Sequence, residues 1–194
     1  SAIAADLFQA YYCVIFDISM ELVSILVDQS CSTWKQMKRL YKRSFPQKER
    51  LPFRVLKRSI CSPLVIWYAY YDRGCFVGFA YLVADSSLAY LFYLAVDETV
   101  RSKGYGSAIL ADIASKFSQP IVLDMEECDA HAKNFKQRLR RKTFYESNGF
   151  VSAGFKVAYN GVRYESWIRG TNFEKDKLLA LFKRYRLEVL GKRK

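Results

Sequence analysis

Histidine is almost absent from this sequence. The single histidine, His131, lies near Asp129 in a stretch typical of a loop, and no second histidine can join it. Neither a serine triad nor a metal site is therefore supported, and we expect no metal. The five cysteines are an odd number and include no Cys-x-x-Cys pair, which indicates neither a disulfide framework nor a zinc knuckle. We expect a cytoplasmic protein.

Long apolar runs are missing as well. Charged residues interrupt each run before it reaches the roughly 18 to 20 residues needed to span a bilayer, so we expect a soluble protein with no membrane contact. Acidic residues are few, because 19 aspartates and glutamates face 31 lysines and arginines, and the formal net charge is +12. That charge favours binding of an anionic partner, which could be nucleic acid, an anionic membrane surface or a phosphorylated cofactor. The excess lies at 35–58, 133–142 and 173–194, where solvated helix faces are an equally simple interpretation.

The size and composition fit one globular domain. The chain has 194 residues, of which 51% are hydrophobic and 26% charged. Residues 1–19 contain no lysine or arginine and precede Met20, so we interpret them as a leader or an appended extension. The single domain is then expected to cover 20–194.

Apolar periodicity predicts alternating sheet and helix segments. Strands are predicted at 21–27, 64–71, 75–83, 88–96, 121–124, 150–159 and 162–169. Helices are predicted at 33–44, 49–58, between Gly106 and Pro120, at 133–147 and at about 173–190. The strand at 88–96 is apolar on both faces, which is typical of a central strand. The strand, helix and strand that follow predict a right-handed parallel crossover after an antiparallel meander, and hence an α/β fold.

The most informative motif is Arg101-x-x-Gly104-x-Gly106, which joins the central strand to a helix. Glycines at this spacing let several backbone N–H groups converge at the helix N-terminus, where the dipole also favours an anion. The dinucleotide fingerprint needs a third glycine, but Ile109 occupies that place. A Walker loop needs Gly-Lys-Ser/Thr, whereas Gly106 is followed by serine and alanine. A pyrophosphate cradle of another kind, or an ordinary loop, remains.

In these features the sequence resembles the GNAT superfamily of acyl-CoA N-acyltransferases. Residues 91–106 are similar to its fourth strand and acyl-CoA loop, with the pattern Arg/Gln-x-x-Gly-x-Gly/Ala. Residues 144–150 (FYESNGF) are similar to its closing segment of aromatic, Tyr, Glu, two variable residues, Gly and Phe. The resemblance extends from residue 21 to about 169. It implies a mixed, mostly antiparallel sheet of six or seven strands, flanked by helices and opened in a V between strands 4 and 5, with the C-terminal helix as an addition.

The resemblance also implies how acetyl-CoA binds. The fourth and fifth strands would part and offer unpaired backbone groups to the pantetheine arm, while the loop amides bind the pyrophosphate. A backbone N–H near Leu94 or Val96 would stabilise the negative charge that develops on the thioester oxygen. The implied cofactor-binding residues are Leu94, Ala95, Val96, Arg101, Ser102, Lys103, Gly104, Tyr105, Gly106 and Ser107.

Catalytic roles follow from the same resemblance. Tyr145 matches the tyrosine that often protonates the departing thiolate, and a phenol with an ordinary pKa near 10 can do so while neutral. Packing under the cofactor is the alternative for this ring. Glu126 or Glu127, at the end of the fifth strand, stands where a base for the acceptor amine is often found, although either could be a surface residue.

The implied activity is transfer of an acetyl group from acetyl-CoA to a primary amine, by direct attack in a ternary complex. Two alternatives stay open: a non-enzymatic acyl-CoA-binding regulatory module and, ranked lower, a basic nucleic-acid-binding protein. Arg138 replaces an asparagine that many relatives carry, which leaves the acceptor undecided. A homodimer is a further expectation, since the C-terminal helix and the closing hairpin offer apolar surface.

Overall fold

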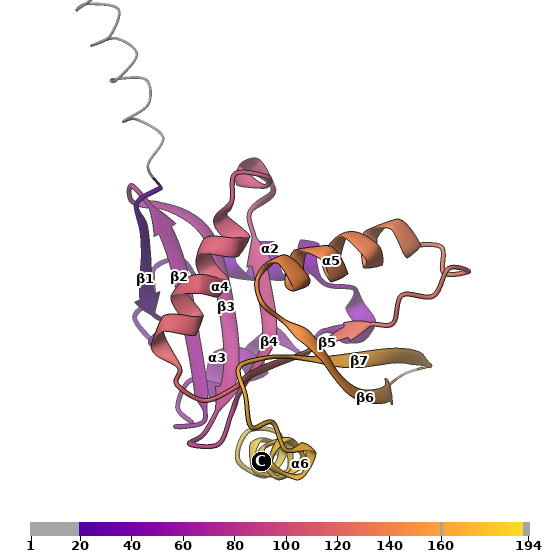
Figure 1. Cartoon of the computed structure of the whole chain (residues 1–194). Coiled ribbons are helices and arrows are strands. Elements are labelled where there is room, and N and C mark those ends of the chain that lie inside the picture. Colours follow the sequence, from indigo (N-terminus) through magenta and orange to yellow (C-terminus); the bar gives the residue numbers. More distant parts are fainter. Residues whose placement is uncertain (1–19, 160, 192–194) are drawn as a thin grey trace, which may run out of the picture.

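The computed structural model describes residues 20–159 and 161–191. Its centre is one seven-stranded sheet in the order β1-β2-β3-β4-β5-β7-β6 (Figure 1). The expected α/β fold with a mixed, mostly antiparallel sheet is therefore confirmed. The interpretation of residues 1–19 as an extension concerns residues outside the described part of the chain.

The first four strands form the predicted antiparallel meander. Their bounds are β1 (Leu22–Leu26), β2 (Val65–Asp72), β3 (Cys75–Ala84) and β4 (Ala89–Val96). Arg73 and Gly74 connect β2 to β3 with φ values of 48° and 77°. Two consecutive positive φ angles match the right-handed twist of a hairpin, which explains the glycine in this turn.

The parallel crossover also forms where it was expected. Helix α4 (Tyr105–Lys116) connects β4 to β5 (Ile121–Glu126), and the short helix η2 (Glu98–Val100) lies in the connection before α4. The two strands pair only at Ala89 with Ile121 and at Tyr90 with Val122. Beyond these positions β5 stays paired with β7 along its whole length, so it leaves β4 and the sheet opens.

The far side of the opening consists of helix α5 (Phe135–Ser147) and the hairpin of β6 (Val151–Tyr159) and β7 (Val162–Arg169). Gly149 ends α5 with φ 80°, and the amide of Phe150 then donates to the carbonyl of Tyr145 at 3.0 Å. A glycine in the left-handed conformation is a common end of a helix. Leu139, in the same helix, is 46% exposed and does not join the core.

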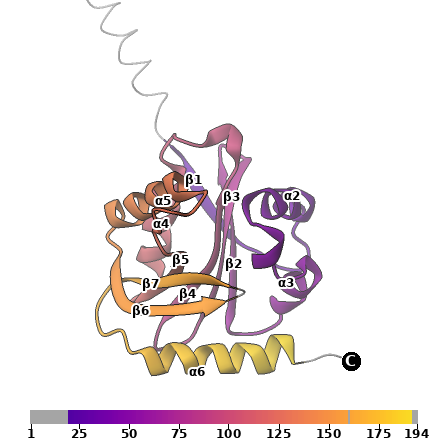
Figure 2. The ribbon, with the colours of Figure 1, turned by 90° about the vertical axis from the view of Figure 1, so that its right-hand side faces the viewer.

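The remaining helices cover the other face of the sheet and its lower edge (Figure 2). Their bounds are α2 (Trp34–Ser44), η1 (Gln47–Glu49), α3 (Phe53–Ser59), α6 (Lys175–Tyr185) and η3 (Arg186–Leu190). The predicted helix at 49–58 begins only at Phe53. Pro52 precedes it, and a proline disfavours helical conformation in the residue before it, which separates η1 from α3.

Two apolar clusters occupy the two faces of the sheet. The cluster beneath α2, α3 and α6 is rich in aromatic rings and includes the fully buried Tyr41, Trp67 and Phe79. The cluster beneath α4 and α5 includes Ile109, Ile113 and other aliphatic residues. Among the described residues, no helix combines the length and apolar character needed to cross a bilayer.

Candidate active site

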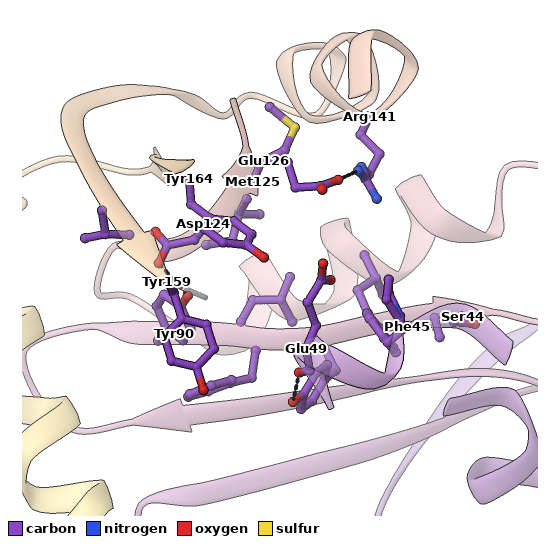
Figure 3. A pocket seen from close by; sticks show the side chains of 18 of the residues that line it. Ser44, Phe45, Glu49, Tyr90, Asp124, Met125, Glu126, Arg141, Tyr159 and Tyr164 are labelled. Atoms are coloured by element: carbon purple, nitrogen blue, oxygen red, sulfur yellow. Dashed lines mark hydrogen bonds and ion pairs between the residues drawn. The ribbon is translucent and has the colours of Figure 1, made fainter. Parts of the chain in front are cut away.

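A cavity of about 1140 Å³ occupies the opening between β4 and β5. Its walls come from β4, β5, the β6–β7 hairpin, the segment at 43–51, α5 and α6. Figure 3 shows polar side chains from several of these elements pointing into the same space. A cavity of this size is large enough for a small-molecule ligand.

A buried polar cluster connects the strands at the apex of the opening. The Tyr90 hydroxyl donates to Asp124 Oδ2 at 2.9 Å, and the Ser166 hydroxyl donates to Asp124 Oδ1 at 2.6 Å. Burial raises the pKa of Asp124, although both hydrogen bonds oppose this shift. The cluster links β4, β5 and β7 at the point where β4 and β5 begin to part.

The part of β4 that follows this apex along the strand has an open edge. Leu94, Ala95 and Val96 line the cavity, and none of them has a pairing partner on β5. Their free backbone groups face the opening because β5 has moved away. This arrangement fits an extended ligand that hydrogen-bonds to β4 as an added strand would.

The loop between β4 and α4 has the geometry of an anion-binding nest. Ser102 and Gly104 have positive φ values of 63° and 88°, and Gly104 is the N-cap of α4. Alternating left-handed conformations turn successive N–H groups to one side, at the positive end of a twelve-residue helix. The side chains of Ser102, Lys103 and Ser107 are exposed beside this helix end.

Not every predicted loop residue offers its side chain to the cavity. Arg101 lines it, and its Nε donates to the carbonyl of Val96 at 3.4 Å. Tyr105 is buried, with its hydroxyl bonded to Asp72, so only its backbone remains for a ligand. At Gly106 an added Cβ would lie 3.0 Å from the Phe144 ring, so this ring would have to shift to accept a side chain there.

Tyr145 lines the cavity opposite β4. Its ring packs edge-to-face on Phe144 and Phe150, with centroids 5.1 and 5.5 Å apart. Burial raises the pKa of Tyr145 to about 12, and the nearby charge of Arg141 opposes this shift. The phenol is therefore neutral over the physiological range and keeps its proton to donate.

The two predicted glutamates differ in position. Glu126 lines the cavity but is 9% exposed and held by three partners, since Asn134 donates at 3.2 Å, Arg138 at 3.2 Å and Arg141 also bonds to it. Glu127 is not among the lining residues. Ion pairs with Lys156 (2.5 Å) and Arg163 (2.9 Å) hold it, and the Lys156 hydrogen bond is the main reason that the pKa of Glu127 is lowered.

A third glutamate, Glu49, was missed by the sequence analysis. It lies in η1 and lines the cavity, where Figure 3 shows its carboxylate pointing inward. Burial raises the pKa of Glu49 and the negative charge of Glu126 raises it further, while the Tyr164 hydroxyl and the positive charges of Lys48 and Arg141 oppose this shift. Among the described residues, Glu49 has no ion-pair partner within 4 Å. The only available signal was that Glu49 is the single acid in the basic segment 35–58.

Hydrogen bonds from two tyrosines fix the position of the Glu49 backbone. The Tyr93 hydroxyl donates to the carbonyl of Glu49 at 3.0 Å and accepts from the amide of Leu51 at 3.2 Å. The Tyr41 hydroxyl in turn donates to the carbonyl of Leu51 at 3.0 Å. Two buried tyrosines, from β4 and α2, thus hold the η1 segment over β4.

A sheet opened between its fourth and fifth strands, with a nest at the following helix, is the arrangement that defines the GNAT fold. Residues 63–152 match the family model of the acetyltransferase (GNAT) domain. This span includes both sequence motifs, at 101–106 and 144–150. No curated protein matches the chain significantly.

Solved structures share the fold of this chain. A GNAT-family protein from Bacteroides thetaiotaomicron has a TM-score of 0.70 at 18% identity, covering 88% of this chain and 99% of the other. An aminoglycoside 6'-N-acetyltransferase complexed with coenzyme A has a TM-score of 0.58 at 14% identity, covering 78% and 99%. The ribosomal-protein-S18-alanine N-acetyltransferase from Escherichia coli has a TM-score of 0.56 at 15% identity, covering 79% and 97%.

At these identities the likeness to solved structures concerns the fold, and the family model adds the sequence signature. Residues 63–152 therefore match the GNAT acetyltransferase domain, in agreement with the sequence motifs. This match supports acetyl transfer as the chemistry of that part of the chain.

Proposed function

We propose that the protein transfers an acetyl group from acetyl-CoA to a primary amine by direct attack in a ternary complex. The observation that carries this proposal is the coincidence, in one cavity, of the unpaired β4 edge, the neutral phenol of Tyr145 and the carboxylate of Glu49. Each group meets a separate requirement of the reaction: positioning the donor, protonating the thiolate and deprotonating the amine.

The β4 edge and the loop suit acetyl-CoA. Backbone groups at 94–96 would hold the pantetheine arm, and the nest at Ser102 and Gly104 would receive the pyrophosphate. Arg101, Lys103 and the exposed Arg140 add positive charge near this end of the cavity. When bound, acetyl-CoA supplies the thioester whose acetyl group is transferred.

The residues around the thioester then stabilise the developing charge and transfer the protons. An N–H of β4 near Leu94 or Val96 stabilises the negative charge that develops on the carbonyl oxygen. As the C–N bond forms and the C–S bond breaks, the Tyr145 hydroxyl donates a proton to the departing sulfur. The amine nitrogen loses one proton to a base, and the return of one proton to the Tyr145 oxygen restores both groups, so the proton count balances over the reaction.

For the proton acceptor we propose Glu49. Glu126 faces the same cavity, but its carboxylate is already bonded to two guanidinium groups and an amide. Glu127 is paired outside the cavity wall. We propose that Glu126 instead holds Arg138 and Arg141 in place at the mouth of the cavity.

The test combines binding and turnover of the purified chain. Acetyl-CoA should raise the thermal unfolding midpoint, because it binds the folded state, while NAD and ATP should leave the midpoint nearly unchanged. Release of CoA should then require an added amine. Thermal stabilisation without turnover on any amine would favour a binding module, and the lack of any response to acetyl-CoA would overturn the proposal altogether.

Substitution Tyr145→Phe separates binding from catalysis. The ring contacts with Phe144 and Phe150 remain, so acetyl-CoA affinity should stay within about twofold, whereas turnover should fall by roughly 10²-fold or more. Equilibrium binding and kcat at saturating substrates measure the two effects. Full turnover in the variant, with chemistry limiting the rate, would show that Tyr145 is only a packing residue.

A further inference from the structure

The end of the cavity next to α6 is apolar and aromatic. Tyr90 and Phe92 pack edge-to-face on Phe182, with centroid distances of 4.7 Å for Tyr90 and 5.9 Å for Phe92, so the three rings form one wall. Phe155 from β6 and Leu178 from α6 complete the wall. Such a wall provides favourable burial for an apolar group and little for a hydrated one.

Helix α6 is fixed to the core of the sheet. The Tyr185 hydroxyl lies 2.9 Å from the Tyr81 hydroxyl, which lies 2.7 Å from Ser59 Oγ. The Ser59 hydroxyl donates to the carbonyl of Leu56 at 2.6 Å. This chain of hydrogen bonds connects α6, β3 and α3, so the apolar wall is a formed part of the structure, as Figure 2 shows by the position of α6 below the sheet.

One carboxylate with no ion-pair partner among the described residues stands beside this apolar space. Glu49 enters the cavity from the η1 side and Tyr164 enters from β7, so that their polar ends share the space between the two walls (Figure 3). Helix α6 lines the lower end of the same cavity.

We propose that the acceptor is a compact amine with an apolar body, whose amino group meets Glu49 and whose body packs against Phe92 and Phe182. This inference rests on the proposed function and names the acceptor class for the same site. A polycationic sugar or polyamine would bury several charges against a wall that offers aromatic carbon, which is unfavourable. A peptide N-terminus would bring the polar groups of its backbone against the same aromatic carbon.

The first experiment is an acceptor panel with the full chain and acetyl-CoA, with the acetylated product followed by mass spectrometry. The panel includes 2-phenylethylamine and hexylamine as apolar amines, spermidine and kanamycin as polar polyamines, and a peptide with a free N-terminal alanine. We expect kcat/KM for the apolar amines to exceed the others by at least about tenfold, the value of burying roughly two methylene groups.

A variant pair tests the wall itself. Phe182→Ala should raise KM for 2-phenylethylamine about tenfold or more with little change in KM for acetyl-CoA, and should shift preference toward the bulkier 4-phenylbutylamine. Leu187→Ala is the matched control, because Leu187 is 65% exposed in the following helical turn and does not line the cavity. That variant should behave as the wild type.

The outcomes distinguish this inference from the function on which it rests. Efficient acetylation of kanamycin, spermidine or the peptide, at or above the rate with apolar amines, would overturn the acceptor class and leave acetyl transfer intact. Transfer to none of the amines, despite binding of acetyl-CoA, would overturn both. An unchanged acceptor preference in Phe182→Ala would show that the wall does not select the substrate and would also overturn the inference.

Discussion

Glu49→Gln is the sharpest test of the proposed chemistry. The substitution removes one negative charge and keeps the shape of the side chain, while Tyr93 still holds the backbone of residue 49 through its 3.0 Å hydrogen bond. The fold should therefore survive. Loss of a general base lowers the rate by about 10²- to 10⁴-fold, and a 100-fold loss corresponds to about 2.7 kcal/mol of transition-state stabilisation.

The raised pKa of Glu49 predicts in which direction kcat changes with pH. Burial and the charge of Glu126 raise the pKa of Glu49 above its ordinary value of 4.5. A base works when deprotonated, so wild-type kcat should fall as the pH drops through this raised pKa. In Glu49→Gln the acidic limb should disappear, and the remaining rate should be low and flat there.

The assay is kcat at saturating acetyl-CoA and amine from about pH 5 to about pH 9, the range in which a raised carboxyl pKa would be seen. Glu174→Gln is the control, because Glu174 is an exposed residue at the start of α6 whose side chain pairs with Lys177 and does not line the cavity. If Glu49→Gln raises KM for the amine but leaves kcat and its acidic limb intact, Glu49 only anchors the ammonium group. If Glu126→Gln removes the limb instead, Glu126 is the base.

Three further substitutions test the framework of the site. Gly78→Ala should destabilise the fold by about 1–3 kcal/mol in urea unfolding, because an added Cβ would lie 2.5 Å from the carbonyl oxygen of Ala95. Tyr185→Phe should cost about 1–2 kcal/mol in the same measurement, since the buried Tyr81 hydroxyl loses its 2.9 Å partner. Asp124→Asn should flatten the pH dependence of the unfolding midpoint: the raised pKa of Asp124 contributes stability at low pH that is lost as the pH rises through it, and the amide removes this titration.

Local patterns determined most of the elements correctly. The apolar strand at 88–96, the turn at Arg73 and Gly74 and the helix end at Gly149 each depend on neighbouring residues, so their signals could be seen in the sequence. The helix expected at 49–58 was too long by four residues at its start, because its basic and apolar spacing outweighed the signal of Pro52. Leu139 is exposed although it is an apolar residue of α5, because the residues of a helix alone do not show which neighbours it meets.

The sequence by itself determined the family signature, the order of the strands and the glycine-containing loop before α4, because each of these depends on short segments of chain. Only the tertiary structure decided which acidic side chains share the cavity. Glu126 and Glu127 are adjacent in sequence, yet opposite faces of the strand end separate them, and Glu49 joins Glu126 from a segment far away in the chain. Successive residues of a strand point to opposite sides, which separates Glu126 from Glu127. The long-range packing of η1 on β4 places Glu49, so no local sequence pattern could show that Glu49 and Glu126 share the cavity.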